Sequence, residues 1–240
     1  MNQSAAPEMI SPPSPGRWPW FGWFAVLFFA AMNVFAISTS PPERDMGDLQ
    51  KIMYVHIPVA WNAFIAFFVA AISFLRVLWK RDERADLLGF AAAEVGTVLT
   101  GLTLVLGMLW AKPTWGVWWA WEPRLTSTLV LFLIFCGYLA MRSFVDDPDR
   151  RAQWSAAVGL LGAINVPIVY MSVRWWRTLH QLQSTPDTID SPYKLGMRLN
   201  AFAVLFLVIY FIRRRYEAAL TERAAEHRAQ ALALGGTNNG

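Results

Sequence analysis

The segment WGVWWAWEPRLT, residues 115–126, separates two long apolar runs, 87–110 and 127–144. Each run has about the length, ~20 residues, with which an α-helix crosses a bilayer. Further runs of this kind lie at 18–38, 58–79, 154–173 and 196–212. In the bilayer core only helices and closed barrels satisfy every backbone hydrogen bond. The pattern therefore predicts an all-α membrane protein with six transmembrane helices.

The composition agrees with a membrane protein and excludes several other classes. The chain has 240 residues, of which 55% are hydrophobic and 16% are charged, whereas soluble domains carry about 25% charged residues. The basic residues border the apolar runs and form no stripe on a soluble face, so nucleic acid is not an expected partner. The single cysteine, Cys136, lies in an apolar run and is expected to pack there. The sequence contains no haem-attachment motif CxxCH, no zinc pattern, no ATP-binding motif GxxxxGK[ST] and no metalloprotease motif HExxH. We therefore do not expect this chain to be an enzyme.

The positions of Lys and Arg predict the orientation of the helices. An even number of spans puts both termini on one side, and most of the 21 Lys and Arg residues fall on that side. Because cytoplasmic loops are enriched in these residues, both termini are expected in the cytoplasm. The loops on the opposite, outer side are then roughly 39–57, 111–126 and 174–195.

Three regions follow from this organisation. Residues 1–17 are rich in Pro and Ser and are predicted to be a disordered cytoplasmic N-terminus. Residues 18–212 form the predicted six-helix membrane domain, and residues 213–240 a cytoplasmic helical tail with a flexible, Gly-rich end. Short interfacial helices are expected in the outer loops. One would cover 46–56, where Leu49, Met53 and His56 would share a face.

The Trp-rich segment would present one aromatic face if it were helical, because Trp115, Trp118, Trp119 and Glu122 fall at i, i+3, i+4 and i+7. Such a face at a membrane edge can anchor the protein among lipid head groups, or it can support a large flat ligand. The tryptophans near the inner side are explained by the aromatic belt of membrane proteins. Those on or near the outer side cluster more tightly than a belt requires, and they are Trp61, Trp110, Trp115, Trp118, Trp119, Trp121, Trp175 and Trp176.

Two histidines lie on the same predicted side as this cluster. His56 precedes the second apolar run and His180 follows the fifth. If the fifth helix continued outward, Val173, Trp176 and His180 would share a face. Two interfacial histidines with unrelated hydrogen bonds, and a pair of ligands, are equally good interpretations at this point. The third histidine, His227, is expected to be a solvated residue of the tail.

Haem fits this combination of residue types. It is flat and apolar, and its iron accepts two axial imidazoles. Its propionates need cationic or N–H donors, such as Arg124, Arg174 and Arg177. A histidine pair could instead hold zinc or copper, but nothing supplies the remaining ligands. Glu122 could be one, although pairing with an arginine or orienting a ligand is the favoured interpretation.

An acidic residue, Glu94, lies within the third run. An ionisable group there is costly and indicates a function by default. The favoured interpretation is nevertheless a hydrogen-bonded carboxyl that faces another helix or a partner subunit. Asn165 is expected only to pack.

Three segments resemble the CcmC family, the haem exporter protein C of bacterial cytochrome c maturation. The first is YVHIPVAW at 54–61, and the second is 112–127, which is similar to the tryptophan-rich "WWD" signature of haem-handling membrane proteins. The third, 165–181, runs from Asn165-Val166-Pro167 to Leu179-His180-Gln181. Together with the six runs, they cover the chain from about residue 20 to 210.

The resemblance implies that b-type haem is held without covalent attachment at the outer face of the bacterial inner membrane. His56 and His180 would be its axial ligands, and the Trp-rich segment its platform. Haem would pass to the periplasmic haem chaperone CcmE, and the chain would work with the ABC-type subunits CcmA and CcmB and the small subunit CcmD. The family motif usually ends in Asp where this chain has Glu122, whose carboxylate reaches one methylene further. The expected site residues are His56, His180, Trp61, Trp115, Trp118, Trp119, Trp121, Glu122, Arg124 and Trp176.

Two other functions stay open at this stage. A haem-conducting permease subunit of an ABC-type complex would line a cavity with Glu94 and the glycines of the third run. A quinol-linked haem oxidoreductase has less support, because the spans contain no second histidine pair.

Overall fold

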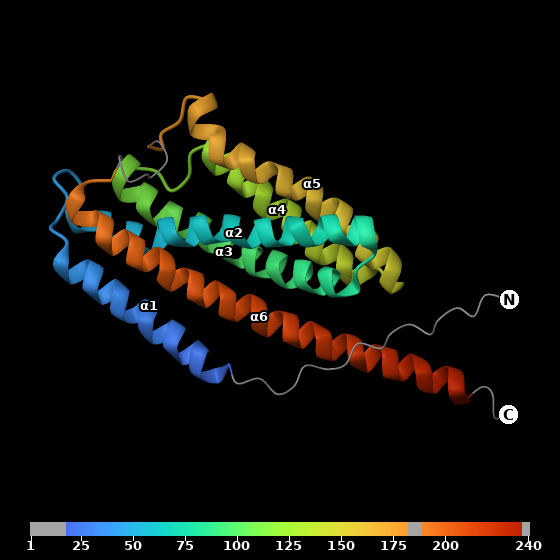
Figure 1. Ribbon diagram of the computed structural model, residues 1–240. Helices are drawn as coiled ribbons and strands as arrows, with labels where there is room; N and C mark the ends of the chain where they lie inside the picture. The colour runs from blue at the N-terminus through green and yellow to red at the C-terminus, as the bar shows by residue number, and fades with distance from the viewer. Residues whose placement is uncertain (1–17, 182–188, 237–240) are drawn as a thin grey trace.

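The computed structural model describes residues 18–181 and 189–236, which form six long helices (Figure 1). Each helix is long and apolar enough to cross a membrane, so the predicted six-helix membrane protein is confirmed. The predicted disordered segment 1–17 and the residues 237–240 lie outside the described residues. The helices are α1 (Pro19–Thr39), α2 (Met53–Lys80), α3 (Glu83–Trp115), α4 (Pro123–Phe144), α5 (Pro148–Trp175) and α6 (Ser191–Gly236).

Helix α2 is the centre of the assembly. It packs most extensively against α3 and also contacts α5 and α6, while α4 pairs with α5. Helix α1 lies along α6 and touches the rest of the bundle little (Figure 1). The segments 40–52, 116–122 and 176–181 meet at one end of the bundle, which we call the outer end. Both ends of the described chain lie toward the opposite, inner end (Figure 1).

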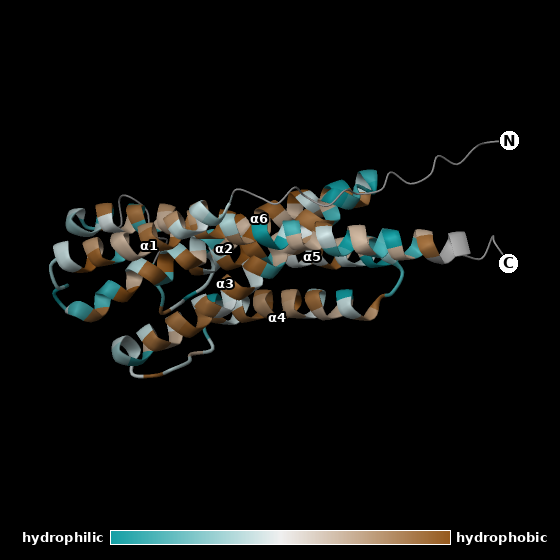
Figure 2. Ribbon diagram, turned by 90° about the horizontal axis from the view of Figure 1, so that it is seen from below, coloured by the Kyte–Doolittle hydropathy of each residue, from teal (hydrophilic) through white to brown (hydrophobic). Residues whose placement is uncertain are grey.

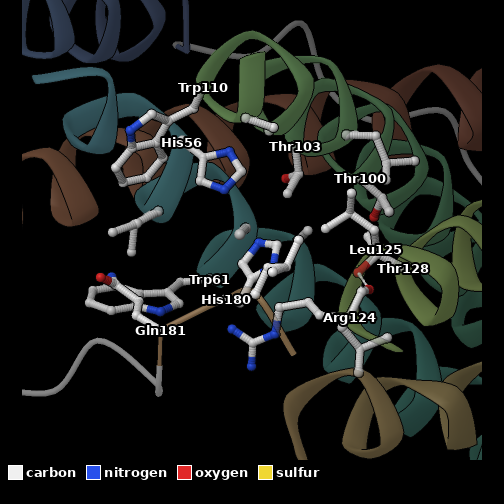
Figure 3. Close-up of a pocket in the computed structure, with 18 of the residues that line it drawn as sticks. His56, Trp61, Thr100, Thr103, Trp110, Arg124, Leu125, Thr128, His180 and Gln181 are labelled. Carbon is white, nitrogen blue, oxygen red and sulfur yellow. Dashed lines mark hydrogen bonds between the residues drawn. The ribbon is translucent and has the colours of Figure 1, made fainter. Parts of the chain in front are cut away.

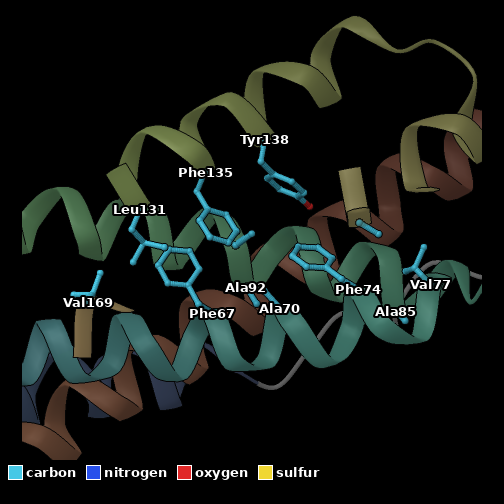
Figure 4. Close-up of a cluster of buried hydrophobic side chains, with 12 residues drawn as sticks. Phe67, Ala70, Phe74, Val77, Ala85, Ala92, Leu131, Phe135, Tyr138 and Val169 are labelled. Carbon is cyan, nitrogen blue, oxygen red and sulfur yellow. The ribbon is translucent and has the colours of Figure 1, made fainter. Parts of the chain in front are cut away.

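The core lies between α2, α3, α4 and α5 (Figure 4). The rings of Phe67 and Phe135 stack with centroids 4.1 Å apart, and Phe74 packs on Tyr138 at 5.3 Å. Gly96 of α3 permits this arrangement, since a Cβ atom there would lie 2.8 Å from the Phe67 ring. Apolar residues also cover much of the outward-facing helix surface between more polar ends (Figure 2), as expected of helices surrounded by lipid.

Three of the helices start where an acidic residue caps them. The side chains of Asp82, Glu122 and Asp147 accept hydrogen bonds from the first backbone N–H groups of α3, α4 and α5. Proline follows the cap at Pro123 and Pro148, where its missing N–H costs nothing. Helices α3 and α5 therefore extend beyond the apolar runs that predicted them.

The second helix begins before its predicted start at Pro58. A short 3₁₀ helix, η1 (Asp48–Ile52), runs directly into α2 at Met53, so Pro58 lies inside the helix. The segment from residue 213, predicted to be a helical tail, continues α6 without a break, and α6 remains one helix to Gly236.

Two predicted helical faces are wrong. Helix α3 ends at Trp115 because Gly116 adopts a left-handed conformation with φ of 77°, and residues 116–122 are not helical. Trp115, Trp118, Trp119 and Glu122 therefore share no helical face. Helix α5 ends at Trp175, and Trp176 is extended, so Val173, Trp176 and His180 share none either.

Two polar residues within the spans have partners in other helices. Glu94 accepts a hydrogen bond from Nε of Arg215 on α6, which agrees with the favoured interpretation of a paired carboxyl. Asn165 donates to the carbonyl oxygen of Ser127 at 2.8 Å and so joins α5 to α4. Cys136 is a free, half-buried thiol.

Candidate functional site

A cavity of about 280 Å³ opens among α2, α3, α4 and α5 near the outer end (Figure 3). Its wall is mainly apolar and aromatic, with a few polar groups, as in most small-molecule sites. On α3 the lining runs from Trp115 to Thr100, which is about 22 Å along the helix axis at 1.5 Å per residue. The cavity therefore reaches well below the outer loops.

His56 enters the cavity from the first turns of α2. Its ring meets the Trp110 ring edge to face, with centroids 5.7 Å apart. Gly107 of α3 leaves room beside the imidazole, because a Cβ atom there would lie 3.4 Å from Cε1 of His56. Nδ1 of His56 is buried and has no hydrogen-bond partner in the described part of the chain. Nε2 is therefore the nitrogen available to a ligand.

His180 reaches the same cavity from the segment that follows α5. Its ring packs edge to face on Trp115, with centroids 5.0 Å apart, and its backbone N–H donates to Oγ1 of Thr178 at 3.1 Å. Nδ1 of His180 lies 3.2 Å from Oε1 of Glu122, a close contact that is not well aligned as a hydrogen bond. His56 and His180 both line this cavity, and Figure 3 shows both imidazoles pointing into it.

Glu122 connects the start of α4 with the segment that carries His180. Its carboxylate accepts hydrogen bonds from the Leu125 N–H and from the Thr178 hydroxyl. Burial raises the pKa of the Glu122 carboxyl, but the interactions with His180, Thr178 and Leu125 outweigh it and lower the pKa to about 2. Glu122 is therefore a carboxylate that joins the start of α4 to the segment carrying His180.

Arg124 supplies the positive charge of the cavity wall, beside His180 (Figure 3). One Nη donates to the carbonyl oxygen of Tyr170 at 3.2 Å, while Nε is buried without a partner among residues 18–181 and 189–236. Arg174 and Arg177, the other predicted donors, are exposed and do not line the cavity.

Comparison with known proteins identifies the relatives of the chain. The family model CcmC, described as "Heme exporter protein C", matches residues 1–231. The heme exporter protein C of Bradyrhizobium diazoefficiens is 37% identical over 205 residues, which cover 83% of this chain and 78% of that protein. That of Escherichia coli K12 is 33% identical over 191 residues, or 79% and 78%. The chain belongs to the CcmC family.

This CcmC family member brings together six of the ten residues predicted for its site. The residues that line the cavity are His56, Trp61, Trp115, Arg124 and His180, and Glu122 lies directly behind His180. Trp118, Trp121 and Trp176 are more than half exposed and lie outside the cavity wall. Trp119 is partly buried and also outside it, with its ring 5.5 Å from that of Trp121.

Part of the cavity wall was missing from the sequence prediction. Trp110, Gly107, Thr103 and Thr100 line it from α3. They recur at steps of three or four residues, so a helical period extended inward from Trp110 would have found them.

The donor set suits a ligand that needs two imidazoles. No group of three or more His, Cys, Asp or Glu side chains that could hold a bare metal ion occurs within the described ranges. Zinc sites use at least three protein ligands. Haem iron is satisfied by two axial histidines. Nε of Arg124 is buried and has no hydrogen-bond partner in the described part of the chain, so this guanidinium keeps a donor for a ligand.

Proposed function

We propose that this protein binds haem in the outer cavity, with His56 and His180 as the axial ligands of the iron. One observation carries the proposal: two imidazoles from separate elements, α2 and the segment after α5, enter one cavity lined by tryptophans. Bound haem would place its iron between the two imidazoles. Membership of the CcmC family supports a role in haem export and cytochrome c maturation.

The remaining residues of the cavity have distinct roles in this proposal. Trp61 and Trp115 cover the apolar faces of a flat ligand. Arg124 pairs with a propionate, since a guanidinium binds carboxylates with charge-assisted hydrogen bonds. Trp118, Trp121 and Trp176 complete the platform from the exposed outer surface. Binding is non-covalent, because the sequence has no CxxCH attachment site.

The proposed place of the protein is the bacterial inner membrane, with the cavity facing the periplasm and both termini in the cytoplasm. The haem would pass to the periplasmic chaperone CcmE, and the chain would assemble with CcmA, CcmB and CcmD. In this scheme the chain is a transfer factor and catalyses no reaction. The distribution of Lys and Arg supports the orientation, and the position of the cavity at the outer end supports the direction of transfer.

A path for haem through the whole bundle has less support. Val169 and Phe64 line the inner part of the cavity and also pack on the core cluster that contains Phe67 and Phe135. Phe67 and Phe135 are fully buried. Because Glu94 is paired with Arg215, it offers no free carboxylate to such a path.

Replacement of the two histidines tests the proposal. In purified protein, His56→Ala and His180→Ala should each weaken haem retention and shift the absorption spectrum, because each removes one axial ligand. His227→Ala is the matched control and should leave the spectrum unchanged, since His227 lies on the tail of α6, where it contacts Glu83 at the start of α3. If the double variant, His56→Ala with His180→Ala, keeps the normal haem content and spectrum, the two histidines are not the axial ligands.

A further inference from the structure

The two histidines of the cavity have unequal surroundings. Nδ1 of His180 lies 3.2 Å from a carboxylate oxygen of Glu122, although neither histidine Nδ1 makes a well-aligned hydrogen bond within the described residues. Nδ1 of His56 is equally buried, but it meets no acceptor in the described part of the chain. Among residues 18–181 and 189–236, the ring of His56 is supported by packing, against Trp110 and beside Gly107.

This difference affects how strongly each imidazole binds a metal. A neutral imidazole that coordinates through Nε2 keeps its proton on Nδ1. A carboxylate that accepts this proton in a hydrogen bond orients the ring and makes Nε2 a stronger donor, and losing such a partner typically lowers metal affinity by about 10–100-fold. A buried Nδ1–H without an acceptor has no such support. Within the described residues a carboxylate lies beside Nδ1 of His180 and none beside Nδ1 of His56, so His180 is the stronger of the two ligands.

We infer that His180 is the retained ligand and that His56 is the ligand that dissociates first when haem leaves the cavity. The inference rests on the proposed function. When the bond to His56 breaks, both bonding electrons return to its Nε2, its Nδ1 keeps the proton, and no electron is transferred. One axial position then opens for a ligand from the acceptor, while His180 still holds the haem.

The supports of His180 strengthen this order. His180 lies on a loop segment, which by itself could swing away more easily than a residue of helix α2. However, the Thr178 hydroxyl donates to Glu122, and the His180 N–H donates to Thr178 at 3.1 Å. Glu122 is in turn fixed as the cap of α4 through the Leu125 N–H. The segment that carries His180 is thus fixed in two ways, by the Thr178 side chain on Glu122 and by the His180 backbone on Thr178.

The order is tested by the rate at which the haem-loaded, full-length protein loses haem to excess apomyoglobin. Haem loss from His180→Ala should be at least about 10-fold faster than from His56→Ala. Glu122→Gln should speed haem loss in the otherwise normal protein and in His56→Ala, but it should add nothing in His180→Ala. Gln keeps an oxygen that can accept from the Leu125 N–H, so the helix cap is preserved.

The iron–imidazole stretching frequency, measured by resonance Raman on the ferrous variants, gives a second readout. A hydrogen bond from Nδ1 to a carboxylate raises this frequency. It should therefore be higher in His56→Ala, where His180 remains, and only there should Glu122→Gln lower it. Asp48→Asn is the matched control, because Asp48 is an exposed outer carboxylate that pairs with Lys51 and does not line the cavity.

Each outcome distinguishes the inference from the proposed function. Equal haem loss from the two histidine variants, or faster loss from His56→Ala, would overturn the order while leaving both residues as ligands. If neither variant changes haem retention or the spectrum, the proposed function itself fails. If His180→Ala retains no haem, its rate of haem loss cannot be compared with that of His56→Ala. The test is then whether adding Glu122→Gln to His56→Ala speeds haem loss. An unchanged rate would overturn the inference.

Discussion

At the scale of single residues, Arg124 makes the most specific prediction about the ligand. It is the one arginine of the three candidates that lines the cavity. Replacing it by Leu should weaken haem binding about 10- to 100-fold, because a hydrogen bond to a charged group contributes roughly 1.5–3 kcal/mol. Titration of the purified protein, followed by absorbance, measures the affinity. Arg177→Leu, an exposed site outside the cavity, should have no effect.

Haem dimethyl ester separates the charge of Arg124 from its packing. The ester lacks propionate charges, so Arg124→Leu should change its affinity little. Equal losses for haem and for the ester would show that Arg124 acts through its contact with Tyr170 and the shape of the wall, and not through the propionates.

From the sequence one can predict which residues belong to the candidate site. The contacts between these residues are much harder to predict. His56 and His180 stand out because hydropathy puts both on one side of the membrane, beside the tryptophans. The contact of Glu122 with Thr178 and His180 depends on where α5 ends and how the chain turns afterwards. No local pattern encodes that turn, so the role of Glu122 behind His180 emerges only from the fold.

At the scale of elements, the end of α3 depends on one glycine. Gly116 has φ of 77° and donates its N–H to the carbonyl oxygen of Lys112 at 3.0 Å. An L-residue in this conformation costs roughly 1–2 kcal/mol, so Gly116→Ala should lower the thermal unfolding midpoint of the purified protein. Gly137→Ala is the matched control. Gly137 lies inside α4 with open space around its Cβ position, and Ala should stabilise a helix there by up to about 1 kcal/mol.

The two glycine variants should therefore shift the midpoint in opposite directions. A midpoint that rises in both would mean that α3 can continue past Trp115 without cost. In that case the Trp-rich segment would be able to form the aromatic helical face expected from its spacing.

Hydropathy locates the six helices but not their ends. The apolar runs mark the stretches that lipid can surround, and these stretches were confirmed. The helices continue into polar residues until an acidic cap such as Asp82 or Asp147 begins them, or until a left-handed residue such as Gly116 ends them. Such signals are single residues, and the long continuous helix α6 lacks any near the predicted boundary at 213.

At the scale of the whole molecule, a buried ion pair joins the helices near the inner end of the bundle. Arg142 of α4 contacts both carboxylate oxygens of Asp86 on α3, at 2.6 and 2.8 Å, and donates to Ser155 of α5 at 2.8 Å. The side chains of Arg142 and Asp86 are 8% and 2% exposed, so removing one charge leaves the other buried and uncompensated. The ion pair and the hydrogen bond to Ser155 join three helices, and removing either charge should lower the stability of the folded protein.

We expect Arg142→Ala to lower the free energy of unfolding by about 3–5 kcal/mol, the usual cost of breaking a buried pair from one side. Removing both partners, with Asp86→Ala, should cost less than the sum of the single variants. The pair of Arg76 and Asp82, in which the arginine is exposed, is the control, and Arg76→Ala should cost at most about 1 kcal/mol.

The same variants test whether the two ends of the bundle are independent. The packed core around Phe67 and Phe135 lies between the ion pair and the cavity. Arg142→Ala that remains folded should therefore keep the haem spectrum of the unmodified protein, even though its unfolding midpoint falls. A changed spectrum would mean that the inner end sets the geometry of His56 and His180 through α2, and that the core transmits strain along the full length of the bundle.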